Sequence, residues 1–219
     1  MIPVSKVKKP KGFDAKVKVP GEQWLKENPS VKRPIALWTP YTSTLADGFA
    51  GLCGYAAMFD HTGGTVDHYL SFKNHPNKAY DWSNFRFASA TLNSSKRNAD
   101  DTVLDPYQVG KEWFAIELPS LQMRVTDAVP AASRAKTEFT LKRLGLRDGE
   151  RVIRWRQSWY NLYLSGDLTL EGLRKMAPLI AQAVDRQQSA TRQRAASQAT
   201  SPPQEDRQAP TPKSKPPKA

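Results

Sequence analysis

The sequence has very few of the side chains that bind metals through sulfur or nitrogen. Cys53 is its only cysteine, and it has three histidines in 219 residues. One cysteine rules out an intramolecular disulfide and a zinc cluster built from cysteines. The scarcity of cysteine fits a reducing compartment, and we expect a cytoplasmic protein.

Long apolar runs are missing as well. The first eleven residues, MIPVSKVKKPK, contain no apolar run of the length found in signal peptides. The most apolar stretch, residues 45–59, is interrupted by Asp47 and by three glycines. It is too short and too interrupted to cross a bilayer, so we expect a soluble protein with no membrane partner.

What the chain does have is positive charge, and most of it lies at the two ends. The net charge is +12, of which residues 1–18 carry +5 and residues 189–219 carry +4. Excess positive charge favours a polyanionic partner, most often nucleic acid. Charged ends are equally typical of solubilising tails, and both interpretations stay open.

The composition changes along the chain and predicts four regions. A basic, proline-rich arm over residues 1–42 is expected to lie on the domain, with one helical turn within residues 21–28. An α+β core should follow over residues 43–128, and a helical subdomain over residues 129–188. Residues 189–219 lack periodicity and are rich in Gln, Ser and Pro, so we expect a disordered tail.

Local patterns predict the individual elements. A short helix should lead into a β-hairpin over residues 57–73, whose turn is HTGG, and Asp81 should cap a helix over residues 82–98. Further strands are expected near residues 112–117 and 121–126, and helices over residues 132–144, 148–164 and 168–187. In the second of these helices an apolar face with Trp155 and Trp159 predicts core packing.

Asp67 and His68 stand together within an otherwise apolar strand pattern, GTVDHYLSFK. Neighbouring side chains on a strand point to opposite faces, so both cannot lie under one apolar layer. A strand end that carries both groups to a rim would explain the pair. An ordinary surface pair of Asp and His is the simpler alternative.

Two asparagines further along the chain are candidates for the same site. Asn84 lies sixteen residues after His68, and Asn93 nine residues after Asn84. Nine residues are two and a half helical turns, so the two asparagines would face opposite sides of one helix. If Asn84 precedes the helix, Asn93 can converge with Asp67 and His68, with Asn84 behind the imidazole.

Such a group suits phosphodiester hydrolysis. A neutral histidine has a pKa near ~6.5 and can act as a general base near neutral pH if its second nitrogen is held by a carbonyl. Asp67 and Asn93 offer hard oxygen ligands, which favour Mg²⁺ or Mn²⁺ over zinc.

These segments resemble a known family. GTVDHYLSF, AYDWSNFRFASATLNSSK and VLDPYQ, together with the opening PKGFDAKVKVPG, are similar to the HNH (ββα-metal) endonucleases. The similarity is greatest to the bacterial branch found in anti-phage defence modules of the Septu and retron-associated kind. It covers roughly residues 1–125.

The resemblance implies a role for each matching position. His68 corresponds to the general base, Asp67 to the first metal ligand, Asn84 to the residue that orients the base, and Asn93 to the last metal ligand. Lys96 matches a basic position that contacts DNA phosphate. The resemblance further implies a DNA-cleaving effector that works with an ATPase subunit.

The chain departs from the family at the zinc-binding cysteines. Cys53 matches the first of them, whereas Ala56, Ser89 and Leu92 occupy the other three positions. We therefore expect no structural zinc, with apolar packing in its place.

Other functions remain open at this stage. The alternatives are an inert nucleic-acid-binding or assembly subunit on the same scaffold, and a nuclease that cleaves RNA. His61 and His75 are expected in exposed loops, and Asp105 is expected to cap a turn. Arg151, Arg154 and Arg156 are expected on a solvated face, with a DNA or partner surface as the alternative.

Overall fold

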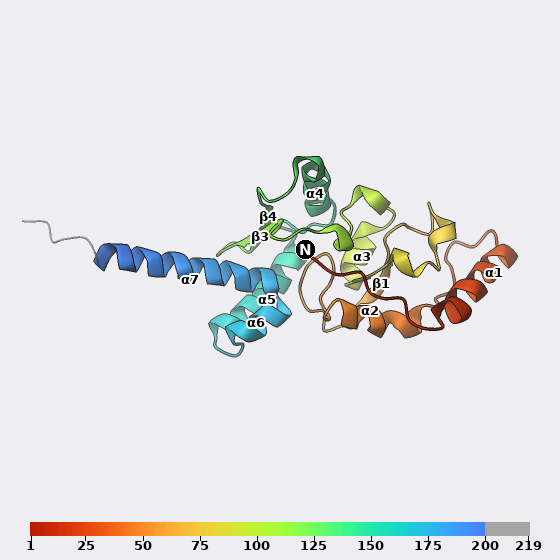
Figure 1. Cartoon of the computed structure of the whole chain (residues 1–219), viewed down its shortest axis with the longest axis horizontal. Helices are drawn as coiled ribbons and strands as arrows, with labels where there is room; N and C mark the ends of the chain where they lie inside the picture. The colour runs from red at the N-terminus through yellow and green to blue at the C-terminus, as the bar shows by residue number, and fades with distance from the viewer. Residues whose placement is uncertain (200–219) are drawn as a thin grey trace, which may run out of the picture. The chain divides into compact units, whose positions relative to one another are not determined.

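The computed structural model describes residues 1–199, and the chain divides into two units, residues 1–185 and 186–219. The described residues combine helices with two small antiparallel sheets, which confirms the α+β class (Figure 1). The helices are α1 (Val19–Glu27), α2 (Thr42–Gly48), α3 (Ala90–Lys96), α4 (Ala131–Arg143), α5 (Glu150–Leu164), α6 (Leu170–Met176) and α7 (Pro178–Ala199). The strands are β1 (Thr65–His68), β2 (Phe85–Ala88), β3 (Phe114–Glu117) and β4 (Gln122–Val125).

The N-terminal region is more helical than its prolines predict. A π-helical segment, Asp14–Lys18, runs directly into α1, so the helical stretch is longer than the single turn expected. Pro20 lies in the first turn of α1, where a missing N–H group leaves no hydrogen bond unmade. Phe13 and Val17 are fully buried, so this region adds to the core of the domain.

The first sheet pairs β1 with β2, and α3 follows β2 directly. Val66 pairs with Phe87 and Asp67 with Arg86 in an antiparallel register. The predicted hairpin over residues 57–73 is therefore wrong, because the partner of β1 is β2 and not the preceding segment. Before β1 only an isolated bridge joins Leu52 to Phe59.

The helix expected over residues 82–98 is also wrong in its first half. Asp81 does act as a cap, but of a single 3-10 turn (Trp82–Asn84), after which the chain enters β2. The helix α3 begins after Ser89, whose hydroxyl accepts a hydrogen bond from Leu92 N at 3.3 Å. Asn84 therefore precedes the helix and Asn93 lies on it, as their convergence requires.

The later elements follow the sequence closely up to α6. Strands β3 and β4 and helices α4 and α5 occur where they were predicted. The third predicted helix is divided at Pro178 into α6 and α7. Disorder was predicted from residue 189, which is wrong for residues 189–199, because they continue α7. Ala, Gln and Arg favour helix, and the first proline of the tail is Pro202. The rest of the predicted tail, residues 200–219, lies outside the described residues.

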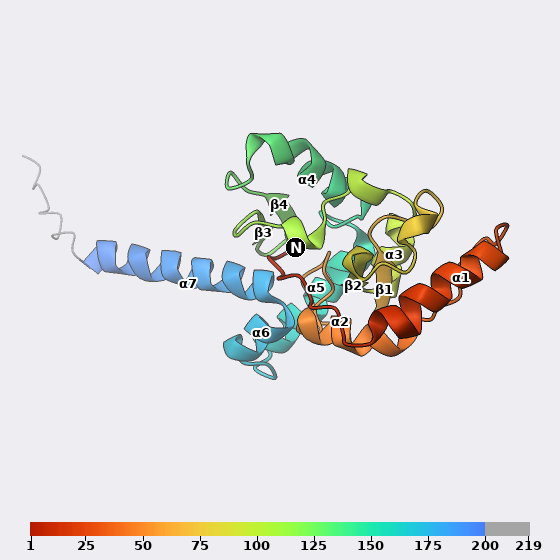
Figure 2. The same cartoon turned by 45° about the vertical axis from the view of Figure 1, so that its right-hand side comes forward.

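Two buried clusters meet at the first sheet. An aromatic cluster contains Phe13, Trp82, Phe85 and Phe87, and a mainly aliphatic cluster contains Leu92 with residues of β3, β4 and α4–α7. Strand β1 contacts both β2 and α3, and Figure 2 shows the three elements side by side. The end of β1 is thus held from two sides, which fixes the backbone that carries Asp67 and His68.

Helix α5 presents one arginine to the interior. Arg156 is 1% exposed, and its guanidinium donates to the carbonyls of Leu121, Leu146 and Arg147 at 2.6–3.3 Å. Burial lowers the pKa of Arg156 to about 10. The prediction that Arg156 belongs to a solvated face is therefore wrong.

Within residues 1–199, no helix combines the length and the apolar character needed to cross a bilayer.

Candidate functional site

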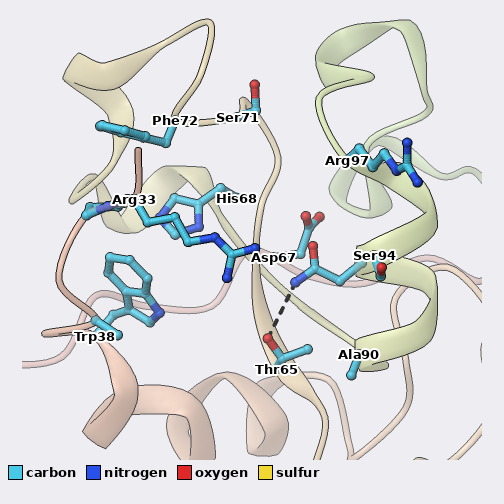
Figure 3. Close-up of a pocket in the computed structure, with 13 residues that line it drawn as sticks. Arg33, Trp38, Thr65, Asp67, His68, Ser71, Phe72, Ala90, Ser94 and Arg97 are labelled. Carbon is cyan, nitrogen blue, oxygen red and sulfur yellow. Dashed lines mark hydrogen bonds between the residues drawn. The ribbon is translucent and has the colours of Figure 1, made fainter. Parts of the chain in front are cut away.

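A depression of about 780 Å³ lies beside the end of β1 (Figure 3). Three segments that are distant in the sequence form its walls. Residues 33–38 contribute Arg33 and Trp38, β1 contributes Asp67 and His68, and α3 contributes Asn93. The depression therefore brings together the three residues to which the sequence assigned base and metal-ligand roles.

His68 is held by aromatic rings and by one backbone carbonyl. Its ring makes edge contacts with Trp38 and Phe85, at centroid distances of 4.5 and 5.0 Å. Its Nε2 lies 2.8 Å from the carbonyl oxygen of Ala79. A carbonyl can only accept, so Nε2 carries the hydrogen and Nδ1 of the neutral ring keeps its lone pair.

Burial favours the neutral form of this imidazole. Removal of His68 from water lowers its pKa, more than the Ala79 carbonyl and the Asp67 charge raise it. The nearby charge of Lys96 acts in the same direction as burial. His68 is thus an oriented imidazole that stays unprotonated at neutral pH, which a general base requires.

Asn84 forms its side-chain hydrogen bonds with the loop that holds His68 and not with the imidazole. Its side-chain nitrogen donates to the carbonyls of Leu70 at 2.9 Å and Lys78 at 3.0 Å, and its oxygen accepts from Leu70 N at 2.7 Å. Lys78 immediately precedes Ala79, whose carbonyl accepts from His68. Asn84 therefore supports the backbone segment whose carbonyl holds His68.

Asp67 and Lys96 form a buried ion pair. Lys96 Nζ lies 3.0 Å from Asp67 Oδ1, and the two side chains are 0% and 1% exposed. Lys96 also donates to the carbonyl of His68 at 2.7 Å, and Tyr55 donates to Asp67 Oδ2 at 2.7 Å. Both carboxylate oxygens thus have a donor, and the pair ties α3 to the end of β1.

This burial argues against the phosphate contact expected of Lys96. With no exposed surface, its ammonium cannot reach a phosphate in this conformation. The lysine instead neutralises the carboxylate from within the fold. The next residue, Arg97, is exposed and lines the depression.

Asn93 presents its oxygen and not its nitrogen toward the open side. Its side-chain nitrogen donates weakly to Thr65 Oγ1 at 3.4 Å and to Val66 O at 3.3 Å, both on β1 (Figure 3). Because the nitrogen faces the strand, Oδ1 is the end of the amide available to a ligand.

Two oxygen donors of the kind that Mg²⁺ and Mn²⁺ prefer line the depression. Asp67 and Asn93 supply one carboxylate and one amide oxygen, and Mg²⁺ in proteins is often held by one or two such groups together with waters and substrate phosphates. Among residues 1–199, no three His, Cys, Asp or Glu side chains gather as a metal site. In this conformation both oxygens of Asp67 already accept hydrogen bonds, from Lys96 and Tyr55, so a cation here would share that carboxylate with them.

The four positions that match the zinc cysteines do come together. Ser89 N donates to Cys53 Sγ at 3.3 Å, and Cys53, Ala56 and Leu92 belong to one buried cluster. Gly54 N also donates to Phe87 O at 2.9 Å, which joins this turn to β2. Apolar packing and these two bonds connect the turn to the sheet and to α3.

The remaining candidates lie away from the depression. His61 is exposed in a turn, and Nε2 of His75 lies 3.8 Å from Oδ2 of Asp100. Asp105 caps a turn by accepting from Tyr107 N at 2.9 Å, as predicted, and forms a buried two-point ion pair with Arg86 at 2.6 and 2.7 Å.

Several residues of the site were not found from the sequence. Arg33 and Trp38 come from the predicted arm, and Tyr55 from the turn before β1. The sequence offers no local signal for them, since each reaches the site through tertiary packing. Arg97 had a signal, because it directly follows the NSSK segment that the resemblance singled out.

Compared with models of known protein families and with curated proteins, the sequence matches none of either.

Proposed function

We propose that this protein is a metal-dependent endonuclease of the HNH type that hydrolyses phosphodiester bonds in DNA. The observation that carries the proposal is the arrangement of His68, Asp67 and Asn93 around one depression, supplied by a strand–strand–helix unit. The order β1, β2, α3 is the order that the name ββα describes.

In the proposed reaction His68 is the general base. Its Nδ1 accepts a proton from a water molecule, while the Nε2–H group stays on the Ala79 carbonyl and fixes the ring. The oxygen of that water bonds to phosphorus, and the bond from phosphorus to the 3′ oxygen breaks. The 3′ oxygen takes a proton from solvent, which leaves a 5′-phosphate and a 3′-hydroxyl.

Asp67 and Asn93 would hold the cation in this proposal. A bound Mg²⁺ or Mn²⁺ stabilises negative charge on the phosphate and on the leaving oxygen. Tyr55 and Lys96 keep the Asp67 carboxylate in place through hydrogen bonds at 2.7 and 3.0 Å. The protein therefore contributes a fixed base and a fixed pair of oxygen ligands.

A wider role follows from the same resemblance. We propose a cytoplasmic effector of an anti-phage defence module whose activity is controlled by an ATPase subunit. RNA cleavage and an inert binding or assembly subunit are the competing functions, and the experiment below separates them.

The test is cleavage of plasmid DNA and of an RNA of similar length by the purified chain. With Mg²⁺ or Mn²⁺ we expect DNA to be nicked or cut, and with EDTA we expect no cleavage. His68→Ala should lower the rate by on the order of 10²–10⁴, the usual contribution of a general base. His61→Ala, a histidine in an exposed turn, is the matched control and should cleave normally.

Three results would count against this proposal. Cleavage of RNA alone would favour the ribonuclease alternative. DNA binding without cleavage under any metal condition, with the ATPase of a neighbouring gene included, would favour an inert subunit. A folded His68→Ala protein that cuts as fast as the wild type would remove the assigned base.

A further inference from the structure

A second depression, of about 400 Å³, adjoins the first one across the end of α3. Its lining contains three arginines and three hydroxyl side chains, Thr91, Ser94, Ser95, Arg97, Arg143 and Arg151. Ser94 and Arg97 line both depressions, so the two are continuous. Figure 3 shows these two residues on the α3 side, across the first depression from Arg33 and Trp38.

The arginines of these depressions differ from the other arginines of residues 1–185. Six arginines there form ion pairs with carboxylates, namely Arg86, Arg124, Arg134, Arg147, Arg154 and Arg174. Arg156 is buried on backbone carbonyls. The four that remain, Arg33, Arg97, Arg143 and Arg151, have no carboxylate partner within this unit, and each of them lines one of the two depressions.

The four arginines at the depressions therefore stand apart from the six that have a carboxylate partner in the same unit. Arg151 and Arg154 make the point on one helix. Arg154 pairs with Glu150 at 2.7 Å one turn away, whereas Arg151 faces the second depression without an acidic partner. Guanidinium groups gathered without counter-charges repel one another, so they favour an anionic ligand that they can share.

We infer that a nucleic-acid strand bound at the His68 site continues along α3 into this second depression, where Arg97, Arg143 and Arg151 bind its phosphates. The inference rests on the proposed function, and it names the path of the substrate and the residues that hold it. Guanidinium groups bind phosphate oxygens through paired hydrogen bonds, and hydroxyls add neutral donors. No apolar side chain lines the second depression, so it suits a sugar–phosphate backbone and not a base or an acyl chain.

The two depressions also explain why the ligand should be a polymer. A single phosphate would be satisfied by one or two arginines. Four arginines without a carboxylate partner, spread over two continuous depressions, match a chain of regularly repeated negative charges. An acidic protein segment is the other polyanion of this kind, and the test includes it.

The test measures binding of a fluorescein-labelled DNA duplex at two salt concentrations, in EDTA so that cleavage does not interfere. The variant is Arg143→Gln with Arg151→Gln, because these two residues line the second depression and not the first. The matched control is Arg124→Gln with Arg154→Gln, which removes the same charge from exposed arginines that have carboxylate partners.

We expect the first pair of changes to weaken binding on the order of tenfold and to reduce the slope of log affinity against log salt by about 1 for each arginine. The control pair should change both quantities much less. Equal effects of the two pairs would mean that only total charge matters and would overturn the inference.

Two further outcomes separate the inference from the proposed function. If the wild type binds DNA with the expected slope but never cuts it, the endonuclease proposal fails and the strand path stands. If labelled poly-glutamate, and not DNA, depends on Arg143 and Arg151, the depression binds an acidic protein and the inference fails.

Discussion

The two sheets of this protein have the same size and pairing but are built from different residues. Each has two antiparallel strands of four residues. In the β3–β4 sheet a charged pair, Glu117 and Arg124, lies at the surface at 3.2 Å with both side chains about half exposed. In the β1–β2 sheet Asp67 and Arg86 are register partners and both are buried, but their side chains form ion pairs with Lys96 and Asp105, outside the sheet.

The segments that connect the two strands of each sheet also differ. Residues 69–84 separate β1 from β2, whereas only residues 118–121 separate β3 from β4. The short connection reverses the chain and packs into the core, where the Leu121 carbonyl accepts from Arg156. The long one supplies the Ala79 carbonyl for His68 and the Asn84 side chain that holds the loop.

This contrast distinguishes a sheet that serves stability from one that serves a site. Buried charges cost desolvation and are kept only where each has a partner, as Asp67 has in Lys96 and Tyr55. An exposed pair costs little and contributes little. The β1–β2 sheet therefore depends on its polar contacts far more than the β3–β4 sheet does.

Replacing Lys96 with Met should break the first sheet most severely. Asp67 would remain buried without its cation, which typically costs about 3–5 kcal/mol of unfolding free energy. Arg124→Met removes the cation of the exposed pair in the other sheet and should cost less than about 1 kcal/mol. Urea unfolding of both variants measures the difference, and a cost for Lys96→Met as small as that for Arg124→Met would contradict the argument.

Asn84→Ala should have the next largest effect, on the free energy of unfolding and on kcat. Three backbone groups lose a buried partner, so we expect a loss of about 2–3 kcal/mol of stability. Under the proposed function kcat should also fall, with KM nearly unchanged, because the Ala79 carbonyl loses its support. Asn77→Ala, at an exposed position of the same loop, is the control. Loss of stability without loss of kcat would restrict Asn84 to a structural role.

The lowered pKa of His68 predicts a dependence on pH for stability as well as for rate. Because the folded pKa lies below that of the unfolded chain, its contribution to stability is complete above about pH 6.5 and is lost as pH falls through the folded pKa. Cleavage should fall on the same acid limb. Urea midpoints of the wild type and of His68→Gln between pH 5 and 8 test this, and parallel curves would refute it.

Chelation should have the smallest effect on the fold. The turn at Cys53 is joined to α3 by packing and by the Ser89 N–H, so EDTA should shift the melting temperature by less than about 2 °C. A purified protein that contains stoichiometric zinc and unfolds on chelation would contradict this prediction.

The grouping of the candidate residues could be predicted from the sequence better than the path of the chain could. Asp67, His68 and Asn93 share one depression because β1 and α3 are adjacent, and an Asn84 that precedes the helix was the condition set for this. The strand β2 was missed because Phe85–Ala88 is buried on both faces and so lacks the alternation that marks a half-buried strand.

The errors at charged residues have another cause. A local pattern cannot show that Lys96 is enclosed or that Arg156 points inward, since both depend on carbonyls supplied by distant segments. The same holds for Arg143 and Arg151, which lie on different helices and meet only in the folded chain. The sequence gives the type of a side chain, and tertiary packing decides whether its charge is buried in the protein or exposed at the surface.

The position of Lys96 has a consequence for how the site would be filled. Its ammonium lies 3.0 Å from Asp67 Oδ1, so the carboxylate is already balanced before any ligand arrives. Under the proposed function a free divalent cation gains little from such a carboxylate, whereas a cation that arrives with a phosphate brings negative charge of its own. Cation and nucleic acid would then raise each other's affinity by the same factor. The site would bind the cation when nucleic acid is present and would respond little to a change in free Mg²⁺ alone.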